Sequence, residues 1–192
     1  MKERGMIFNG EMVRAILDGR KTQTRRPANP STANLLDLQE QYPHKKYNIS
    51  CPFGAVGDRI WVRETWARYN IDQDSHDMAY RATPPADWPE EGRWRPSIHM
   101  PRWASRLMLE ITGVRVERLN SISQEDAQAE GMELTGWRPT YSDPDSGGEV
   151  WTPYDNFAQL WESIYGEESW KANPWVWVIE FKVVPNVQDN PA

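Results

Sequence analysis

The sequence predicts an α+β fold, a small β-barrel of about five to six strands with flanking short helices and two loop insertions. Segments in which apolar and polar residues alternate recur along the chain and are typical of half-buried strands. Fewer segments repeat apolar residues at helical spacing, and these do not alternate regularly with the strands. A doubly wound sheet of βαβ units is therefore not expected.

The N-terminal region predicts a short strand over residues 6–8 and a helix after it. Asn9 is a favourable N-cap, and Gly19 stands where a C′ glycine ends many helices. Four apolar residues of this segment share one helical face: Met12, Val13, Ile16 and Leu17.

Further strands are expected where the alternation returns, at 57–69, 77–83, 106–119 and 173–184. Residues 121–132 predict a helix with Ser123 as its N-cap, and residues 152–166 predict an amphipathic helix. The apolar face of the second helix consists of Phe157, Leu160, Trp161 and Ile164.

No composition change marks a domain boundary, so one domain is expected over residues 1–184. Residues 28–50 and 133–152 are polar or lack periodicity, and we interpret both as loop insertions. The tail, residues 185–192, is expected to be disordered.

Composition restricts the classes of protein to consider. The net charge is −6, but it divides unevenly, with a slightly basic stretch up to residue 118 and a strongly acidic remainder. One cysteine excludes an internal disulfide, and no run of about 20 apolar residues could span a bilayer. The N-terminus has no apolar signal core, so a cytoplasmic location is expected, and no membrane partner.

The stretch "GRKTQTRR", residues 19–26, holds the first candidate site. Nearby arginines and burial would favour a neutral Lys21 amine, which is a competent general base, and Thr24 could hold or activate a nucleophile. Alternatively, Lys21 caps the preceding helix and Thr24 is an ordinary strand residue. Glu130 stands at a helix C-terminus, where a carboxylate is unfavourable unless a cation lies opposite.

Interleaved tryptophans and arginines form the second candidate, in "WVRETW" and "RWRPSIHMPRW". Indole rings stack on unpaired bases and guanidinium groups hydrogen-bond to them, although tryptophans of a core beside solvated arginines would give the same pattern. The sequence shows no metal-binding spacing and no phosphate-binding glycine loop, so neither a metal nor a cofactor is predicted. The candidate substrate-binding residues are Arg25, Arg26, Glu64, Trp66, Arg81, Arg95, His99 and Arg102.

Four motifs in this order, "ILDGRKTQTRR", "GDRIWVRETW", "QAEGM" and "WVWVIEF", resemble the ASCH-domain family of the PUA-like superfamily. The chain is most similar to the longer members encoded by bacteriophages and prophages, which share "MPRWASR" and "NPWVWVIEF". The resemblance implies a PUA-like barrel with a cleft that recognises RNA or a modified nucleoside. It implies the host cytoplasm as the location if the protein is phage-encoded.

A small bacterial ASCH enzyme, which removes the acetyl group of N4-acetylcytidine, has a "GRKTxTxR" segment like the one here. The resemblance implies that Lys21 is the general base, Thr24 a nucleophile or water positioner, and Glu130 a proton relay. The small enzyme lacks residues 28–50, the Trp/Arg loop and residues 133–152, which puts the shape of the cleft in doubt. Two alternatives stay open, a non-catalytic module that binds RNA or a modified base, and a metal-independent ribonuclease. The expected partner is a nucleoside or single-stranded RNA, and the sequence does not predict an oligomeric state.

Overall fold

The computed structural model describes residues 1–69, 77–133, 135–138 and 149–186. Its internal contacts divide it into two compact units. The first unit comprises residues 1–19, 53–112 and 181–192, and the second comprises residues 20–52 and 113–180. Two of the points at which the chain passes from one unit to the other fall inside strands, where composition gives no boundary signal.

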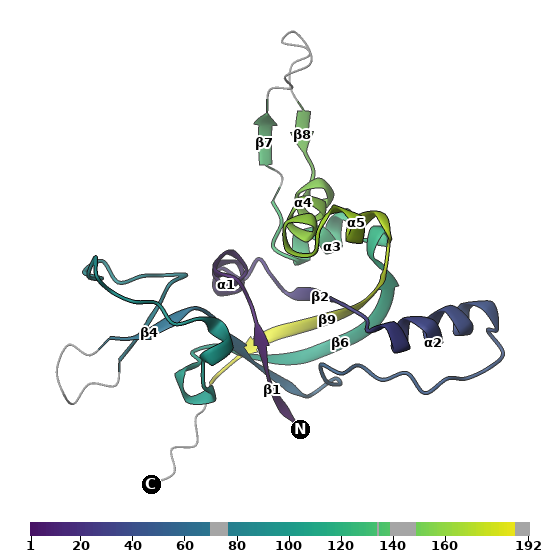
Figure 1. Cartoon of the computed structure of the whole chain (residues 1–192), viewed down its shortest axis with the longest axis horizontal. Helices are drawn as coiled ribbons and strands as arrows, with labels where there is room; N and C mark the ends of the chain where they lie inside the picture. Colours follow the sequence, from purple (N-terminus) through teal and green to yellow (C-terminus); the bar gives the residue numbers. More distant parts are fainter. Residues whose placement is uncertain (70–76, 134, 139–148, 187–192) are drawn as a thin grey trace. The chain divides into compact units, whose positions relative to one another are not determined.

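The fold is α+β, as predicted, and its largest sheet has the strand order β1-β3-β6-β9-β2. Strand β1 runs parallel to β3, which is antiparallel to β6, and β2 is antiparallel to β9 (Figure 1). The predicted barrel closure is not found, because among the described strands no ladder joins the two edges, β1 and β2. The bounds of the five strands are Glu3–Ile7 for β1, Gln23–Pro27 for β2, Arg59–Arg63 for β3, Met108–Arg118 for β6 and Trp175–Val184 for β9.

The first unit contains α1, Gly10–Leu17, which begins as predicted with the Asn9 side chain accepting the Met12 N–H at 2.8 Å. Gly19 follows with φ 75°, the left-handed conformation expected after a helix. Leu17 is exposed, contrary to the predicted face, because the helix ends there and only its earlier turns are buried.

The strand predicted over residues 57–69 is two strands, because β3 ends at Arg63 and β4, Trp66–Arg68, pairs instead with β5, Met78–Tyr80. The Trp/Arg loop is ordered by two 3-10 turns, η1, Ser97–His99, and η2, Arg102–Ala104.

In the second unit, the predicted loop at 28–50 contains a helix, α2, Pro30–Gln41. Asn29 caps it by accepting the Thr32 N–H at 2.8 Å, and Pro30 occupies the first turn, where no N–H is needed. Only Leu36 of this helix is buried, so the segment has no apolar periodicity from which to predict it.

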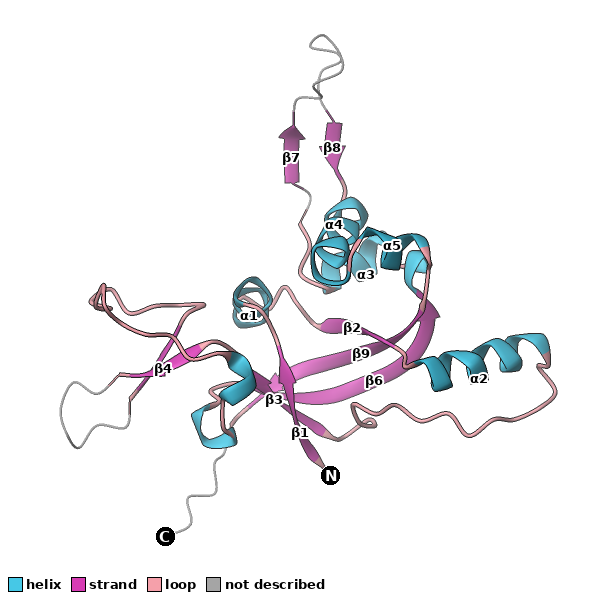
Figure 2. Cartoon of the chain, in the orientation of Figure 1, coloured by secondary structure: helices cyan, strands magenta, loops and turns pink. Residues whose placement is uncertain are grey.

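The remaining helices of this unit are α3, Gln124–Ala129, α4, Pro153–Tyr165, and α5, Glu167–Lys171. Figure 2 shows them grouped together. These helices and the adjacent chain segments share one buried apolar cluster. Its residues are Leu119, Ile122, Ala127, Phe157, Trp161, Val176 and Val178. Two predicted core residues of α4 lie further out, since Leu160 is half-buried and Ile164 is exposed.

The predicted insertion at 133–152 forms two paired strands, β7, Thr135–Arg138, and β8, Glu149–Trp151. The prediction for its central part, residues 139–148, and that for most of the tail, residues 187–192, fall outside the described residues. No described helix has the length and apolar character needed to cross a membrane.

Candidate functional site

Lys21 and Glu130 meet in the interior of the second unit. The Thr22 N–H donates to the Ala129 carbonyl at 2.8 Å, and Lys21 and Glu130 form an antiparallel bridge beside this bond. The Lys21 Nζ donates to Glu130 Oε2 at 2.6 Å and to the Glu130 main-chain carbonyl at 3.1 Å. Both residues are buried, with exposed fractions of 1% and 2%.

Glu130 is held in this place by the end of α3. Ser123 starts the helix by accepting the Asp126 N–H, and Glu130 is its C-cap, followed by Gly131 with φ 94°. A carboxylate at a helix C-terminus is unfavourable by itself. The Lys21 amine and a guanidinium opposite the carboxylate compensate for this placement, as expected from the position of Glu130 in the sequence.

That guanidinium belongs to Arg25. Its Nη1 donates to Glu130 Oε1 at 3.0 Å, and its Nη2 donates to Asp126 Oδ2 at 2.9 Å and Glu117 Oε2 at 3.1 Å. Each carboxylate oxygen of Glu130 therefore accepts from a different cationic group. Arg115 extends the network through Asp126 at 2.8 Å, so the position of Glu130 is fixed by a chain of charged groups.

Burial lowers the pKa of Lys21, and the cations Arg26 and Arg25 lower it further, whereas Glu130 opposes the shift. The hydrogen bonds agree with this direction. A neutral amine has two N–H donors, and the two Glu130 acceptors use both. An ammonium has a third N–H, for which the described residues offer no acceptor at this buried position. Both bonds to Glu130 can be kept when the Lys21 ammonium loses its third proton, so burial and the nearby arginines make the neutral amine more accessible than in an exposed lysine.

Thr24 is buried, and its hydroxyl has no hydrogen-bond partner among the residues that the structure describes. It is therefore not bonded to Lys21 or Glu130. Alternation along β2 places Thr24 on the strand face opposite to Gln23 and Arg25. An unsatisfied buried hydroxyl is rare and costs free energy, so it needs a structural or functional explanation.

Arg26 is half-buried and donates to the Arg25 carbonyl at 3.3 Å. Its positive charge is one of the causes that lower the pKa of Lys21.

The other predicted binding residues lie in the first unit. Glu64 follows β3 and is buried, with Arg106 donating to both of its oxygens at 2.8 and 3.0 Å. Trp66 is also buried, and the Arg95 guanidinium lies 5.3 Å from its ring centroid. His99 is exposed, and Arg102 pairs with Glu3 at 3.0 Å.

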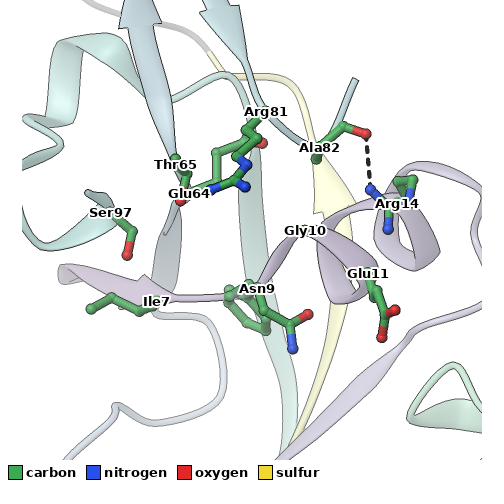
Figure 3. A pocket seen from close by; sticks show the side chains of 11 residues that line it. Ile7, Asn9, Gly10, Glu11, Arg14, Glu64, Thr65, Arg81, Ala82 and Ser97 are labelled. Carbon is green, nitrogen blue, oxygen red and sulfur yellow. Dashed lines mark hydrogen bonds between the residues drawn. The ribbon is translucent and has the colours of Figure 1, made fainter. Parts of the chain in front are cut away.

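Glu64 and Arg81 both line a cavity of about 500 Å³ in this unit (Figure 3). Trp66, Arg95, His99 and Arg102 are not among its lining residues. Of the predicted binding residues in the first unit, the cavity thus brings together one carboxylate and one guanidinium.

Sequence reasoning missed the partners that hold the charged groups in place. Asp126 and Glu117 bind Arg25, and Arg106 binds Glu64. A signal existed for one of them, because Glu117 is two residues from Arg115 along a predicted strand, so the two side chains share one face of that strand. None of the partners could be assigned, because each bond joins segments far apart in the sequence.

No protein-family model matches the chain, and no curated protein matches it. Among solved structures, the chain is similar to the ASCH domain from Lactobacillus crispatus JV V101, at 12% identity over 96% of this chain and 81% of that one, with a TM-score of 0.43. It is also similar to protein EF3133 from Enterococcus faecalis V583, of the DUF984 family, at 13% identity over 96% and 77% of the two chains, with a TM-score of 0.41.

A third similar structure is the hypothetical protein PH0355, at 15% identity over 96% of this chain and all of that one, with a TM-score of 0.40. TM-scores below 0.5 support no argument about function.

Proposed function

We propose that the protein is an amidohydrolase that removes an N-acyl group from a cytidine-like base. The observation that carries the proposal is the buried Lys21 amine, whose pKa is lowered and whose two Glu130 contacts leave the lone pair of the neutral form unused. A buried amine whose pKa is lowered loses its proton more readily than an exposed lysine and is better suited to act as a general base. The resemblance of "GRKTQTRR" to the ASCH enzyme motif supports the same role.

In the proposed reaction, Lys21 accepts a proton from water as the water oxygen attacks the acyl carbonyl carbon. The resulting tetrahedral intermediate collapses when its carbon–nitrogen bond breaks. The leaving exocyclic nitrogen takes the proton back from the Lys21 ammonium, directly or through Glu130, which restores the neutral amine. The products are a carboxylic acid and the free amino group of the base, so atoms and charges balance.

Thr24 has one of two roles in this proposal. Its hydroxyl either attacks the carbonyl as a nucleophile, with its proton relayed to Lys21 through water because Thr24 and Arg25 occupy opposite strand faces, or hydrogen-bonds to the attacking water. The unsatisfied, buried Oγ1 supports an interaction that is completed by substrate or water. Arg25 acts differently, because its three described side-chain hydrogen bonds all go to carboxylates, and it serves to orient Glu130.

The test is the release of acetate and cytidine from N4-acetylcytidine by the purified full-length chain. We expect turnover by the wild type and at least a hundredfold lower rate for Lys21→Ala. As a matched control, Lys171→Ala removes an exposed lysine of the same unit, and its rate should equal that of the wild type. Equal product formation by wild type and Lys21→Ala, or none by either at high enzyme concentration, would remove the proposal.

A second candidate is a non-catalytic reader of RNA or of a modified base, favoured by an aromatic and arginine surface in the first unit. Trp103 is 49% exposed, lies edge-on to Trp66 with ring centroids 5.8 Å apart, and has the Arg68 guanidinium 5.3 Å from its ring. Such surfaces stack on unpaired bases and contact the backbone. Binding of an oligoribonucleotide that Trp103→Ala weakens, without any turnover, would favour this candidate; cleavage of the RNA without added metal would favour a ribonuclease.

A further inference from the structure

The cavity in the first unit is large enough for a small organic molecule. Its volume of about 500 Å³ lies within the range of about 300–1,000 Å³ that is usual for such sites. The lining comes from the end of β1, the first turns of α1, the residues after β3 and β5, and Ser97 (Figure 3). Part of it is apolar, through Ile7, Phe8 and Ala82, and another part carries charged side chains. A ligand that fills this cavity therefore needs an apolar portion and a charged group.

Two arginines of the lining carry charges that pair with no carboxylate among the described residues. Arg14 Nη1 donates to the Ala82 carbonyl at 3.1 Å, which holds its guanidinium at the cavity (Figure 3). The Arg81 side chain has neither a hydrogen bond nor an ion pair in the described part of the chain. Its main chain is anchored, because the Arg81 N–H donates to the Thr65 carbonyl at 3.0 Å. Guanidinium groups with unused donors are suited to bind phosphate.

The two carboxylates of the lining do not cancel these charges. Glu64 is buried, and both of its oxygens accept from Arg106, so a cation outside the lining balances its charge. Glu11 belongs to the first turn of α1, and its carboxylate points away from Arg81 in Figure 3. Two guanidinium groups thus stand against one uncompensated carboxylate, and the charge of the lining favours an anion.

The start of α1 adds two main-chain donors. The Met12 N–H is bonded to the Asn9 side chain and the Val13 N–H to the Asn9 carbonyl. The N–H groups of Gly10 and Glu11, which both line the cavity, have no partner among the described residues. Unpaired N–H groups at a helix N-terminus favour an anion as the two arginines do.

We propose that this cavity binds a small organic phosphate monoester. Arg14 and Arg81 bind the phosphate group, and the apolar part of the lining, Ile7 and Phe8, contacts the organic part of the molecule. A phosphate monoester carries nearly two negative charges at neutral pH, which matches two guanidinium groups. A carboxylate or a sulfate ester carries one charge and would leave one guanidinium unpaired. A bare phosphate ion would leave the apolar lining in contact with water.

The test is titration calorimetry of the full-length chain at low salt and pH 8 with phenyl phosphate, phenyl sulfate and inorganic phosphate. At this pH phenyl phosphate is a dianion, because the second pKa of a phosphate monoester is about 6. Phenyl sulfate has nearly the same shape but one charge less. We expect phenyl phosphate to bind about tenfold more tightly than either of the other two, because it alone combines two charges with an apolar ring.

Three variants connect the binding to the cavity. Arg81→Gln should weaken the binding of phenyl phosphate about tenfold, because it removes one of the two guanidinium groups. Glu11→Gln should tighten it about twofold, because it removes the uncompensated carboxylate of the lining. The matched control is Arg93→Gln, which removes the same charge from an exposed arginine of the same unit outside the lining, and it should bind like the wild type.

Four results would each overturn the proposal. They are no binding of phenyl phosphate at millimolar concentration, equal binding of phenyl phosphate and either comparison ligand, equal losses in Arg81→Gln and Arg93→Gln, and weaker binding in Glu11→Gln. Arg81 and Glu11 are exposed, so their substitution does not put the fold at risk. The experiment measures binding to the first unit rather than turnover. Its failure would leave the hydrolysis proposal standing, and failure of the hydrolysis assay would leave this proposal standing.

Discussion

Replacing Glu130 by Gln should show how strongly the buried pair contributes to folding. The substitution keeps the side-chain shape but removes the negative charge that faces the Lys21 amine and the Arg25 guanidinium. Loss of one partner from a buried pair costs about 3 kcal/mol in the free energy of unfolding. For a chain of 192 residues this corresponds to a fall in Tm of roughly 6–12 °C.

The coupling between the two residues follows from a double-mutant cycle with Lys21→Met. We expect each single variant to lose about 3 kcal/mol and the double variant to lose much less than the sum, giving a coupling energy of about 2–3 kcal/mol. The free energies come from urea unfolding monitored by circular dichroism. The exposed pair Lys171–Glu167 is the matched control, and its cycle should show no measurable coupling. If the losses at Lys21 and Glu130 simply add, the two side chains do not interact as described.

Three further predictions follow from the second unit. The pKa of Lys21 is lower in the folded than in the unfolded chain, so the unfolded chain binds more protons between the two pKa values. The free energy of unfolding should therefore rise with pH from the folded pKa towards about 10.5. In urea titrations at a series of pH values, Lys21→Met should lack this rise. Phe157→Ala should cost about 3–5 kcal/mol, because it opens the apolar cluster under α4, and a loss below about 1 kcal/mol in urea unfolding would contradict that packing. Ser123→Ala removes the N-cap of α3 and should cost about 1 kcal/mol by the same measurement, whereas an unchanged midpoint would argue against the cap.

Local signals predicted most elements of this fold. Asn9, Ser123 and Gly19 act at helix ends as the sequence indicated, because capping depends on residues within one turn. The long strands β6 and β9 were evident from alternation over many residues. These features need no information about distant parts of the chain.

The errors arose where packing is weak or pairing is distant. Helix α2 buries only Leu36, so its sequence has no apolar repeat, and its start depends on Asn29 and Pro30 alone. The prediction of a closed barrel was wrong because the number of strands and their alternation do not indicate whether the two edge strands pair.

The candidate site was predictable in its residue types but not in its contacts. The motif and the unfavourable place of Glu130 pointed to Lys21 and to a cation opposite the carboxylate. The sequence named Arg25 as a base-binding residue, whereas the structure commits its described hydrogen bonds to three carboxylates. Only the register of β2 places Thr24 on the strand face opposite to Arg25.

The protonation of one nitrogen decides the hydrolysis proposal most directly. Selective ¹³C labelling of lysine allows the Lys21 side chain to be titrated by NMR, and Lys21→Met assigns its signal among those of the other lysines. Lys21 should titrate clearly below 10.5, whereas exposed Lys171 should not. A Lys21 ammonium that keeps its proton up to pH 10.5 or beyond would leave the enzyme without its base.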